Sequence, residues 1–391
     1  MSSLRSVEAS LKQIAGENTV FVRSPGRVNL LGEHTDYNEG FVLPAAIGKA
    51  IYLAITPHTD NICKLTALDM HEEHEFTPAT LSPSSKRWPN YIMGVVDQLK
   101  KAGYVFCGFD CLFGGDIPIG AGMSSSAALE AGVAFGLNKT FSLGIDNLSI
   151  VKLAQKAENE FVGVKCGIMD QYVNIFGEKG KVLRIDCRTL DHVSYPFNFP
   201  GISIALFDTR VTHSLAATEY NQRRRECQEG VEAVRRAHPD VRNLRDVSRE
   251  MLAEAESRMT PTVYRRCSYV VGENERMSRA TSALVRKDLK LFGELMYLTH
   301  EGLRDEYAVS CEELDFLVDL ASKHSSVHGA RMMGGGFGGC TINLVDTDAI
   351  DALKEEFFRE YEKRFSKKPN MYVTSIDRGT SEFPLNETST D

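Results

Sequence analysis

The sequence lacks the features of several specialised classes of protein. No run of apolar residues is long enough to span a bilayer, and no apolar segment near the start has the form of an export signal. The cytoplasm is therefore the expected location, and no membrane partner is expected. Positive charge is not in excess, because 45 basic against 53 acidic side chains give a net charge of −8. This balance argues against a nucleic-acid partner.

Cysteine pairs with the spacing of a metal site are also missing. The nine cysteines are scattered, none forms a Cys-x-x-Cys pair, and their odd number favours a reducing compartment over a disulfide-stabilised fold. The rest of the composition is ordinary for a globular chain, with 42% hydrophobic and 25% charged residues. The 391 residues suggest two or three domains, at roughly 150 residues for each domain.

The most informative stretch is a loop rich in glycine and serine, between the strand pattern of residues 109–113 and a helical pattern that begins near residue 127. It reads Gly120-Ala121-Gly122-Met123-Ser124-Ser125-Ser126. Glycines let the backbone approach a phosphate, and a helix start favours an anion. The loop lacks the lysine of a P-loop and the third glycine of a dinucleotide fingerprint. A tight turn with a serine N-cap explains these residues as well as a phosphate site does.

A second stretch, residues 25–38, concentrates polar side chains on a segment broken by proline and glycine. It reads PGRVNLLGEHTDYN. This density suits a ligand with many hydroxyls, because carboxylates and imidazole exchange hydrogen bonds with vicinal hydroxyl groups. A solvated loop with Asx turns is the alternative. His34 and Asp36 also have the spacing of a metal pair, but no third ligand lies nearby and zinc is not expected.

Four further residues each have a functional and a structural interpretation. Glu158 falls on the apolar face of a helix predicted over residues 146–161, where a carboxylate is costly unless it pairs with an arginine or binds Mg²⁺. Asp170 precedes an apolar segment, so capping a helix is its simplest role. Trp88 and Tyr91 stand at the start of another helix, where they either flank a flat base or pack against the fold.

The second half of the chain alternates between strand and helix patterns. Strands are expected over residues 202–207, 341–345 and 371–374, and helices over residues 261–285, 288–305, 311–323 and 348–366. Residues 334–339 contain five glycines in six positions. Such a turn lets the backbone pass close to another group, but it is a weak signal alone.

Together these stretches resemble the GHMP small-molecule kinases. Residues 118–128, PIGAGMSSSAA, resemble the phosphate loop of that superfamily, and residues 331–340 resemble its C-terminal glycine motif. Residues 25–38 resemble the signature of its galactokinase branch, and the resemblance continues through residues 166–171 and 213–220. Several independent motifs occur in the family's order, and they cover the chain up to about residue 345.

The resemblance implies an α+β fold of two domains, with the active site in the cleft between them. The first domain, residues 1–190, would combine a mixed sheet with helices and carry the sugar signature and the phosphate loop. The second domain, residues 191–391, would be a smaller ferredoxin-like layer of sheet and helices with the glycine-rich motif. A monomer is expected, since the family is often monomeric.

The resemblance also implies an activity, which is ATP-dependent phosphorylation of the C1 hydroxyl of galactose, the first phosphorylation step of galactose catabolism. Galactose and MgATP are the implied ligands. The matching positions are Asp170 and Arg27 for catalysis; Glu33, His34, Thr35, Asp36, Gly167, Asp170 and Tyr220 for the sugar; Gly120 to Ser126 with Trp88 and Tyr91 for ATP; and Ser126 and Glu158 for Mg²⁺.

In this scheme Asp170 accepts the proton of the C1 hydroxyl, and Arg27 stabilises the transferring charge. The sequence departs from the family pattern in three places. Met123 replaces a leucine of similar volume and should matter little. Met333 stands in place of a threonine, and residues 208–210 differ from the usual polar triplet. Because of these last two departures, the sequence does not decide whether the hydroxyl contact at position 333 and the sugar contacts at residues 208–210 are present.

Two other functions fit the same residues. A kinase for a neighbouring sugar, such as N-acetylgalactosamine, arabinose or a uronic acid, would differ in the width of a pocket that the sequence does not reveal. A sensor that binds galactose and ATP without turnover would be expected to lose residues from the serine-rich loop. That loop is intact here, which favours an enzyme.

Overall fold

The computed structural model describes residues 18–118, 120–211 and 216–383, together with Val7, Leu11 and Gly16. Of residues 216 and 217 it describes the backbone alone. The expected motif at residues 213–215 lies outside the described residues, and so does most of the short amphipathic helix expected over residues 4–15. None of the described helices combines the length and the apolar character needed to cross a membrane.

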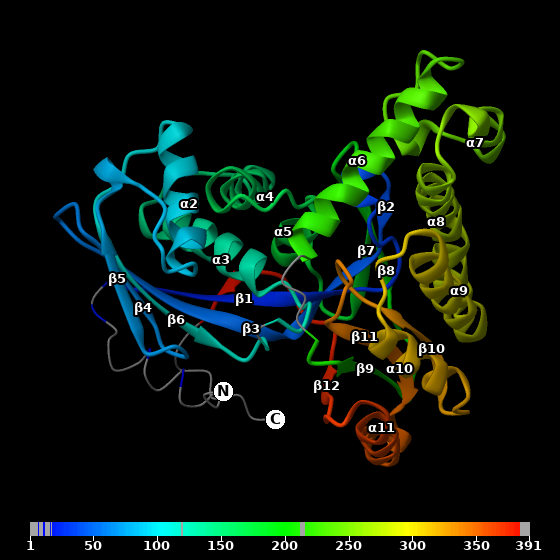
Figure 1. The fold of residues 1–391 in the computed structure, drawn as a ribbon. Coiled ribbons are helices and arrows are strands. Elements are labelled where there is room, and N and C mark those ends of the chain that lie inside the picture. The colour runs from blue at the N-terminus through cyan, green and yellow to red at the C-terminus, as the bar shows by residue number, and fades with distance from the viewer. Residues whose placement is uncertain are drawn as a thin grey trace.

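The largest sheet has six strands in the order β13-β1-β3-β6-β4-β5 (Figure 1). Neighbouring strands are antiparallel except β4 and β6, which run parallel, so the sheet is mixed, as expected. Its strands are β1 (Val20–Asn29), β3 (Pro44–Pro57), β4 (Cys63–Ala67), β5 (Glu72–Phe76), β6 (Phe109–Gly115) and β13 (Ser381–Glu382).

Four helices cover one face of this sheet (Figure 1). They are α2 (Pro89–Lys101), α3 (Ser125–Thr140), α4 (Asn147–Lys156) and α5 (Met169–Phe176). Helix α3 lies close to the strands because it has glycine where the two elements meet. A Cβ atom on Gly132 would lie 2.8 Å from side-chain atoms of both Ser24 and Leu53. This contact packs the middle of α3 against β1 and β3.

A second sheet is antiparallel throughout, with the order β10-β11-β9-β12. Side chains of β9 alternate between its two faces. Ala205 and Phe207 pack with α10 and α11, whereas Ile204 and Leu206 join the main core beside α9. The elements of this layer are β9 (Ile202–Asp208), β10 (Val327–Met332), β11 (Cys340–Asp346), β12 (Asn370–Thr374), α9 (Leu289–Glu301), α10 (Glu312–Ser322) and α11 (Ile350–Phe365).

The remaining helices form an arm that stands away from both sheets (Figure 1), with a core of its own that includes Cys227, Val270 and Tyr307. The arm consists of α6 (Ala216–Arg235), α7 (Arg249–Glu254) and α8 (Pro261–Arg286). A small sheet lies at its base, made of β2 (Phe41–Val42), β7 (Lys181–Asp186) and β8 (Asp191–Pro196). Short 3₁₀ turns cover Asp36–Asn38, Pro78–Thr80, Leu244–Asp246, Glu256–Arg258 and Thr347–Ala349.

The expected division of the chain at residue 190 falls in the turn between β7 and β8, which pair with each other. After β12 the chain returns to the first sheet, where β13 pairs with β1. Asp377, on this return, forms an ion pair with Arg23 of β1 at 2.8 Å. The sequence does not predict the return, because a strand of two residues has no periodicity to detect.

The helix expected over residues 146–161 is correct in position but not in geometry. Helix α4 ends at Lys156, and the chain continues as a π-helical turn over Ala157–Val162, which Gly163 ends at φ +91°. A second π-helical turn, Gly302–Glu306, follows α9. Such wide turns are frequent at functional sites. The first carries Glu158, and the second leads directly into Tyr307.

Candidate active site

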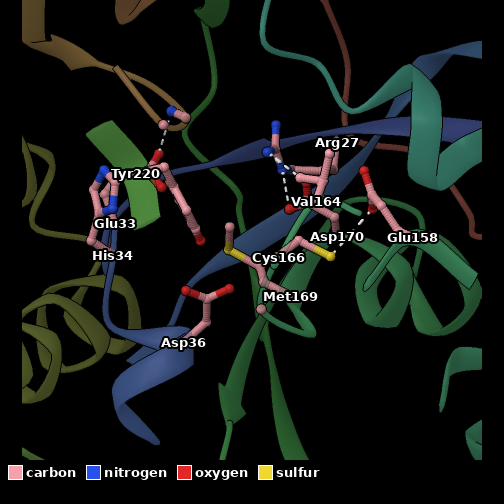
Figure 2. A pocket seen from close by; sticks show the side chains of 13 residues that line it. Arg27, Glu33, His34, Asp36, Glu158, Val164, Cys166, Met169, Asp170 and Tyr220 are labelled. Carbon is pink, nitrogen blue, oxygen red and sulfur yellow. Dashed lines mark hydrogen bonds and ion pairs between the residues drawn. The ribbon is translucent and has the colours of Figure 1, made fainter. Parts of the chain in front are cut away.

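An ion pair between Arg27 and Asp170 joins β1 to the first turn of α5 (Figure 2). The guanidinium Nε and Nη2 donate to the two carboxylate oxygens at 2.8 and 2.9 Å, which is a bidentate geometry. A third guanidinium nitrogen donates to the carbonyl of Gly122 in the serine-rich loop. Burial lowers the pKa of Arg27, but the nearby Asp170 and Glu33 carboxylates outweigh it and the pKa is raised.

Asp170 faces a pocket of about 190 Å³ (Figure 2). The structure brings together here six of the seven residues predicted to hold a sugar. The pocket is lined by Arg27, Glu33, His34, Asp36, Glu158, Val164, Cys166, Gly167, Met169, Asp170, Tyr220, Gly334 and Gly335. These residues come from segments spread over more than 300 positions of the chain, and only the tertiary fold assembles them.

Thr35 is the predicted sugar residue that does not line this pocket. Its side chain is fully buried, and its hydroxyl lies 2.9 Å from the carbonyl oxygen of Gly32 and 2.6 Å from that of Phe41. The hydroxyl therefore closes the turn that presents Glu33 and His34. In this structure Thr35 supports the wall of the pocket, and its predicted contact with a sugar stays a prediction.

Glu33 is held by a buried arginine that the sequence analysis did not single out. Arg331 of β10 is fully buried and donates to the Glu33 carboxylate at 3.1 Å and to the carbonyl of Leu30 at 2.7 Å. The amide of Gly334 donates to the same carboxylate oxygen at 2.7 Å. The glycine-rich motif thus contributes a backbone donor and an arginine to the sugar signature, which lies about 300 residues earlier in the chain.

The electrostatics of the pocket keep His34 neutral and Asp36 partly protonated near neutral pH. Burial and the Arg223 charge lower the pKa of His34 to about 3. Burial and the Asp170 carboxylate raise the pKa of Asp36 to about 7. Asp36 packs directly on Gly167, where any Cβ atom would overlap its carboxylate. A side chain at position 167 would therefore displace the Asp36 carboxylate.

The serine-rich loop is tied to the ion pair at three points. The carbonyl of Met123 accepts from the Arg27 amide at 3.2 Å, the carbonyl of Gly122 accepts from the Arg27 guanidinium, and the Ser124 hydroxyl donates to Asp170. Ser124 has φ +56°, and its side chain makes no capping hydrogen bond to α3. The expected N-cap serine therefore contacts Asp170 instead. Ala121 and Met123 are buried, whereas Gly120 is exposed.

A second pocket, of about 240 Å³, lies at the end of this loop, where α3 begins. The predicted aromatic residues Trp88 and Tyr91 lie in it together with Ser125 and Ser126. Its other walls are mostly apolar, and the Trp88 indole N–H donates to Glu72 at 2.9 Å. The remaining lining residues are Ile51, Ala67, Asp69, Met70, Phe113, Gly114, Gly115, Ile117 and Leu129.

Glu158 lies where the two pockets meet, since it lines the first and accepts a hydrogen bond from Ser126 of the second. The Gln171 amide donates to it at 2.8 Å and to a second buried carboxylate, Glu130 of α3, at 3.3 Å. Burial raises the pKa of both acids. Within the described part of the chain neither acid has an ion-pair partner, so the arginine that the sequence left open for Glu158 is not found.

The two open departures from the family pattern lie outside the first pocket. Met333 is buried, and its amide donates to the carbonyl of Cys340 at 2.9 Å. Asp208, Thr209 and Arg210, which the structure describes, do not line the pocket. The Tyr361 hydroxyl of α11 donates to the carbonyl of Thr209 at 2.8 Å, and this hydrogen bond holds the triplet at the end of β9.

Comparisons with known proteins match these motifs. Family models match in three regions: the galactokinase galactose-binding signature over residues 10–57, the N-terminal domain of GHMP kinases over 90–178 and their C-terminal domain over 280–363. A galactokinase of Roseiflexus sp. is 42% identical over 92% of each chain. The chain belongs to the galactokinase family of the GHMP kinases. A second member, from Chloroflexus aggregans, is 39% identical over 97% of this chain and 98% of its own.

Solved structures of the galactokinase family and its superfamily agree with this membership. The crystal structure of Lactococcus lactis galactokinase complexed with galactose superposes with a TM-score of 0.92 at 34% identity, over 98% of this chain and 100% of that one. The mevalonate kinase of Methanococcus jannaschii has a TM-score of 0.65 at 18% identity, over 93% and 99% of the two chains. The second match shows a common fold. The predicted two-domain α+β architecture of the GHMP kinases is confirmed.

The raised pKa of Asp36 predicts a pH dependence of stability. Between about pH 4 and pH 7 the unfolded chain has lost this proton while the folded chain keeps it, so the folded state loses stability as the pH rises through this window. Asp36→Asn removes the effect. We expect its free energy of unfolding, relative to wild type, to rise by about 1–4 kcal/mol from pH 4 to pH 8 in urea titrations.

Asp319→Asn is the matched control, because Asp319 is exposed on α10 and lies outside the pocket. Its difference from wild type should be the same at both pH values. An equally constant difference for Asp36→Asn would contradict the raised pKa.

Proposed function

We propose that the protein transfers the γ-phosphoryl group of ATP to the C1 hydroxyl of α-D-galactose. The observation that carries the proposal is the bidentate contact of Arg27 with Asp170, in a pocket lined by Glu33, His34 and Asp36 and adjoining the serine-rich loop. A carboxylate in a polar pocket beside a candidate phosphate loop is the arrangement that phosphoryl transfer to a sugar requires.

Asp170 is the proposed general base. Its carboxylate faces the pocket, so it can accept the proton of a hydroxyl bound there. Arg27 holds this carboxylate in one orientation and places positive charge beside the oxygen that attacks. The contact of Arg27 with the carbonyl of Gly122 keeps that charge next to the loop where phosphates would lie. Stabilising transferred charge in this way is a large part of phosphoryl-transfer catalysis.

The sugar would be held by Glu33, His34, Asp36, Tyr220 and the backbone at Gly167. Glu33 and Asp36 supply acceptors for its hydroxyl groups, and Glu33 is fixed from behind by Arg331. The Tyr220 ring lies 5.4 Å from that of His34, measured between centroids, and closes one side of the pocket. A set rich in acceptors suits a neutral polyol, because every sugar hydroxyl is a donor.

The nucleotide would lie across the serine-rich loop. We assign Trp88 and Tyr91 to the adenine, because they lie in the mostly apolar second pocket, and Gly120 to Ser126 to the phosphates. The loop leads directly into α3, whose N-terminal end favours bound anions. Ser125 and Ser126 line the adenine pocket, so a nucleotide bound there would lie next to the loop that is proposed to hold its phosphates.

Ser126 and Glu158 would hold Mg²⁺. Within the described residues no group of three or more His, Cys, Asp or Glu side chains forms a metal cluster. One carboxylate and one hydroxyl still suit Mg²⁺, which keeps several waters and binds substrate phosphates. The absence of an ion-pair partner for Glu158 and Glu130, among the residues described, fits a bound cation. Once bound, the ion would neutralise phosphate charge, while Gln171 orients the Glu158 carboxylate.

Three broader statements belong to the same proposal. The division into residues 1–190 and 191–391 is supported by the two main sheets, although β13 returns to the first sheet. A cytoplasmic location is supported by the nine cysteines, all of which are free. A monomer is proposed because the family that the chain resembles is often monomeric.

A panel of sugars tests the proposed substrate. With MgATP we expect the highest kcat/KM for galactose, against N-acetylgalactosamine, arabinose and galacturonic acid, in an assay of ADP release. A higher value for another sugar would replace galactose in the proposal. Absence of sugar-dependent ADP release would favour a sensor over an enzyme.

Replacement of the base tests the mechanism. Asp170→Asn keeps the shape of the side chain but cannot accept the proton, so we expect turnover to fall by about 10²–10⁴-fold while nucleotide affinity stays near that of wild type. The ADP-release assay and a nucleotide titration measure the two effects. Asp146→Asn is the control, since Asp146 caps α4 away from the pocket and asparagine caps equally well. Turnover within a few-fold of wild type in Asp170→Asn would exclude this base.

The proposed metal ligand is tested by a pair of variants on one π-helical turn. Glu158→Gln removes the charge that would face Mg²⁺, and we expect the Mg²⁺ concentration for half-maximal activity to rise at least about tenfold. Glu160→Gln is the matched control, because Glu160 is exposed and accepts from Gln98 at 2.9 Å. Equal Mg²⁺ titrations for the two variants would leave Glu158 with a structural role.

A further inference from the structure

One ring nitrogen of His34 has a hydrogen-bond partner, and the other has none among the described residues. Its Nδ1 lies 2.8 Å from the Tyr37 hydroxyl. Its Nε2 is buried and finds no hydrogen-bond partner of normal geometry among the residues that the structure describes. The residue is 4% exposed, lines the first pocket and has φ +61°. An unpartnered polar atom on a pocket wall is costly unless a ligand satisfies it.

The Tyr37 hydroxyl is the first of a buried chain of polar groups that leads away from the pocket. It lies 2.7 Å from the hydroxyl of Tyr307. The Tyr307 hydroxyl in turn lies 3.3 Å from the sulfur of Cys227, which accepts from the Asn38 amide at 3.7 Å. Among these groups only the far nitrogen of His34 has no hydrogen-bond partner within the described part of the chain.

Tyr307 is fixed by contacts with several neighbouring residues. It is fully buried, directly follows the π-helical turn Gly302–Glu306, and its ring lies 5.0 Å from that of His34 and 4.8 Å from that of Tyr269. Arg223 donates to the carbonyl of Tyr307 at 2.8 Å. Phenylalanine would pack in the same space, so packing alone does not explain the hydroxyl.

The charge state of His34 limits the directions that the hydrogen bonds can take. The imidazole is neutral and carries one N–H, because burial lowers its pKa to about 3. In one of the two possible arrangements the Tyr37 hydroxyl donates to Nδ1, and the single N–H is then on Nε2, the nitrogen without a partner. In that arrangement Nδ1 accepts from Tyr37. Tyr37 accepts from Tyr307, and Tyr307 accepts from the Cys227 thiol, whose pKa burial raises to about 11.

We propose that Tyr307, acting through Tyr37, is a positioning residue that fixes His34 as an Nε2–H donor aimed at the sugar. This inference rests on the proposed function, in which His34 is a sugar ligand. The pocket is rich in carboxylate acceptors, so a fixed neutral donor would let it discriminate between sugars whose hydroxyl groups are placed differently. A sugar hydroxyl opposite Nε2 must present its oxygen, and a wrongly placed oxygen leaves the buried N–H unpaired.

The test combines Tyr307→Phe with nitrogen-15 NMR of the imidazoles and calorimetry with galactose. In the ligand-free wild-type protein we expect the Nε2–H tautomer for His34, whose signal His34→Gln identifies among the ten histidines. In Tyr307→Phe we expect a mixture of tautomers, a Kd for galactose about tenfold weaker, and kcat and the KM for ATP near their wild-type values.

Tyr361→Phe is the matched control. Tyr361 is as deeply buried, and its hydroxyl donates to the carbonyl of Thr209 at 2.8 Å, away from the pocket. It should change neither the tautomer nor the affinity. Tyr37→Phe removes the bond to His34 directly and should give the same mixture, so it carries the test if Tyr307→Phe fails to fold.

Two results would overturn the inference. One is an Nδ1–H tautomer in the wild-type protein, and the other is unchanged galactose affinity in Tyr307→Phe. Failure of the wild-type protein to bind galactose at all would instead contradict the proposed function. The tautomer of His34 would then still decide whether the hydroxyl chain orients the ring.

Discussion

The bidentate contact of Arg27 with Asp170 fixes three segments that lie far apart in the chain. Arg27 belongs to β1, Asp170 to α5, and the loop between β6 and α3 donates to the pair through Ser124 and accepts from it through Gly122. A charge pair out of water is tolerated only when its remaining donors and acceptors are satisfied. Those bonds also fix the proposed base relative to the proposed phosphate loop.

A second buried guanidinium does the same for the sugar signature. Arg331 joins β10 to the carbonyl of Leu30 and to the carboxylate of Glu33, and the neighbouring Gly334 amide adds a further donor. The two arginines approach the pocket from different sheets. Together they hold the facing walls of the pocket by charge-assisted hydrogen bonds, which are stronger than neutral ones.

Carboxyl groups are numerous in the pocket that results. Glu33, Asp36, Glu158 and Asp170 all line it, and burial together with mutual repulsion raises the pKa of Asp36 and Glu158. Such a pocket disfavours an anionic ligand and suits a neutral ligand rich in hydroxyl donors. It also suits a cation where Glu158 meets the serine-rich loop. The chain Cys227–Tyr307–Tyr37 adds one oriented donor, His34, to this acceptor-rich wall.

The sequence by itself determined the motifs and the positions of most strands and helices, because these depend on local periodicity and on glycine and serine at fixed spacings. The mixed sheet with its helices followed from the resemblance to the family. It did not reveal the π-helical turns, the return of β13, or the inward turn of Thr35. Nor did it reveal the roles of Arg331, Glu130 and Tyr307, because the role of a buried polar side chain can be inferred only when its hydrogen-bond partner is known. Those partners lie on other elements, and tertiary packing alone brings them together.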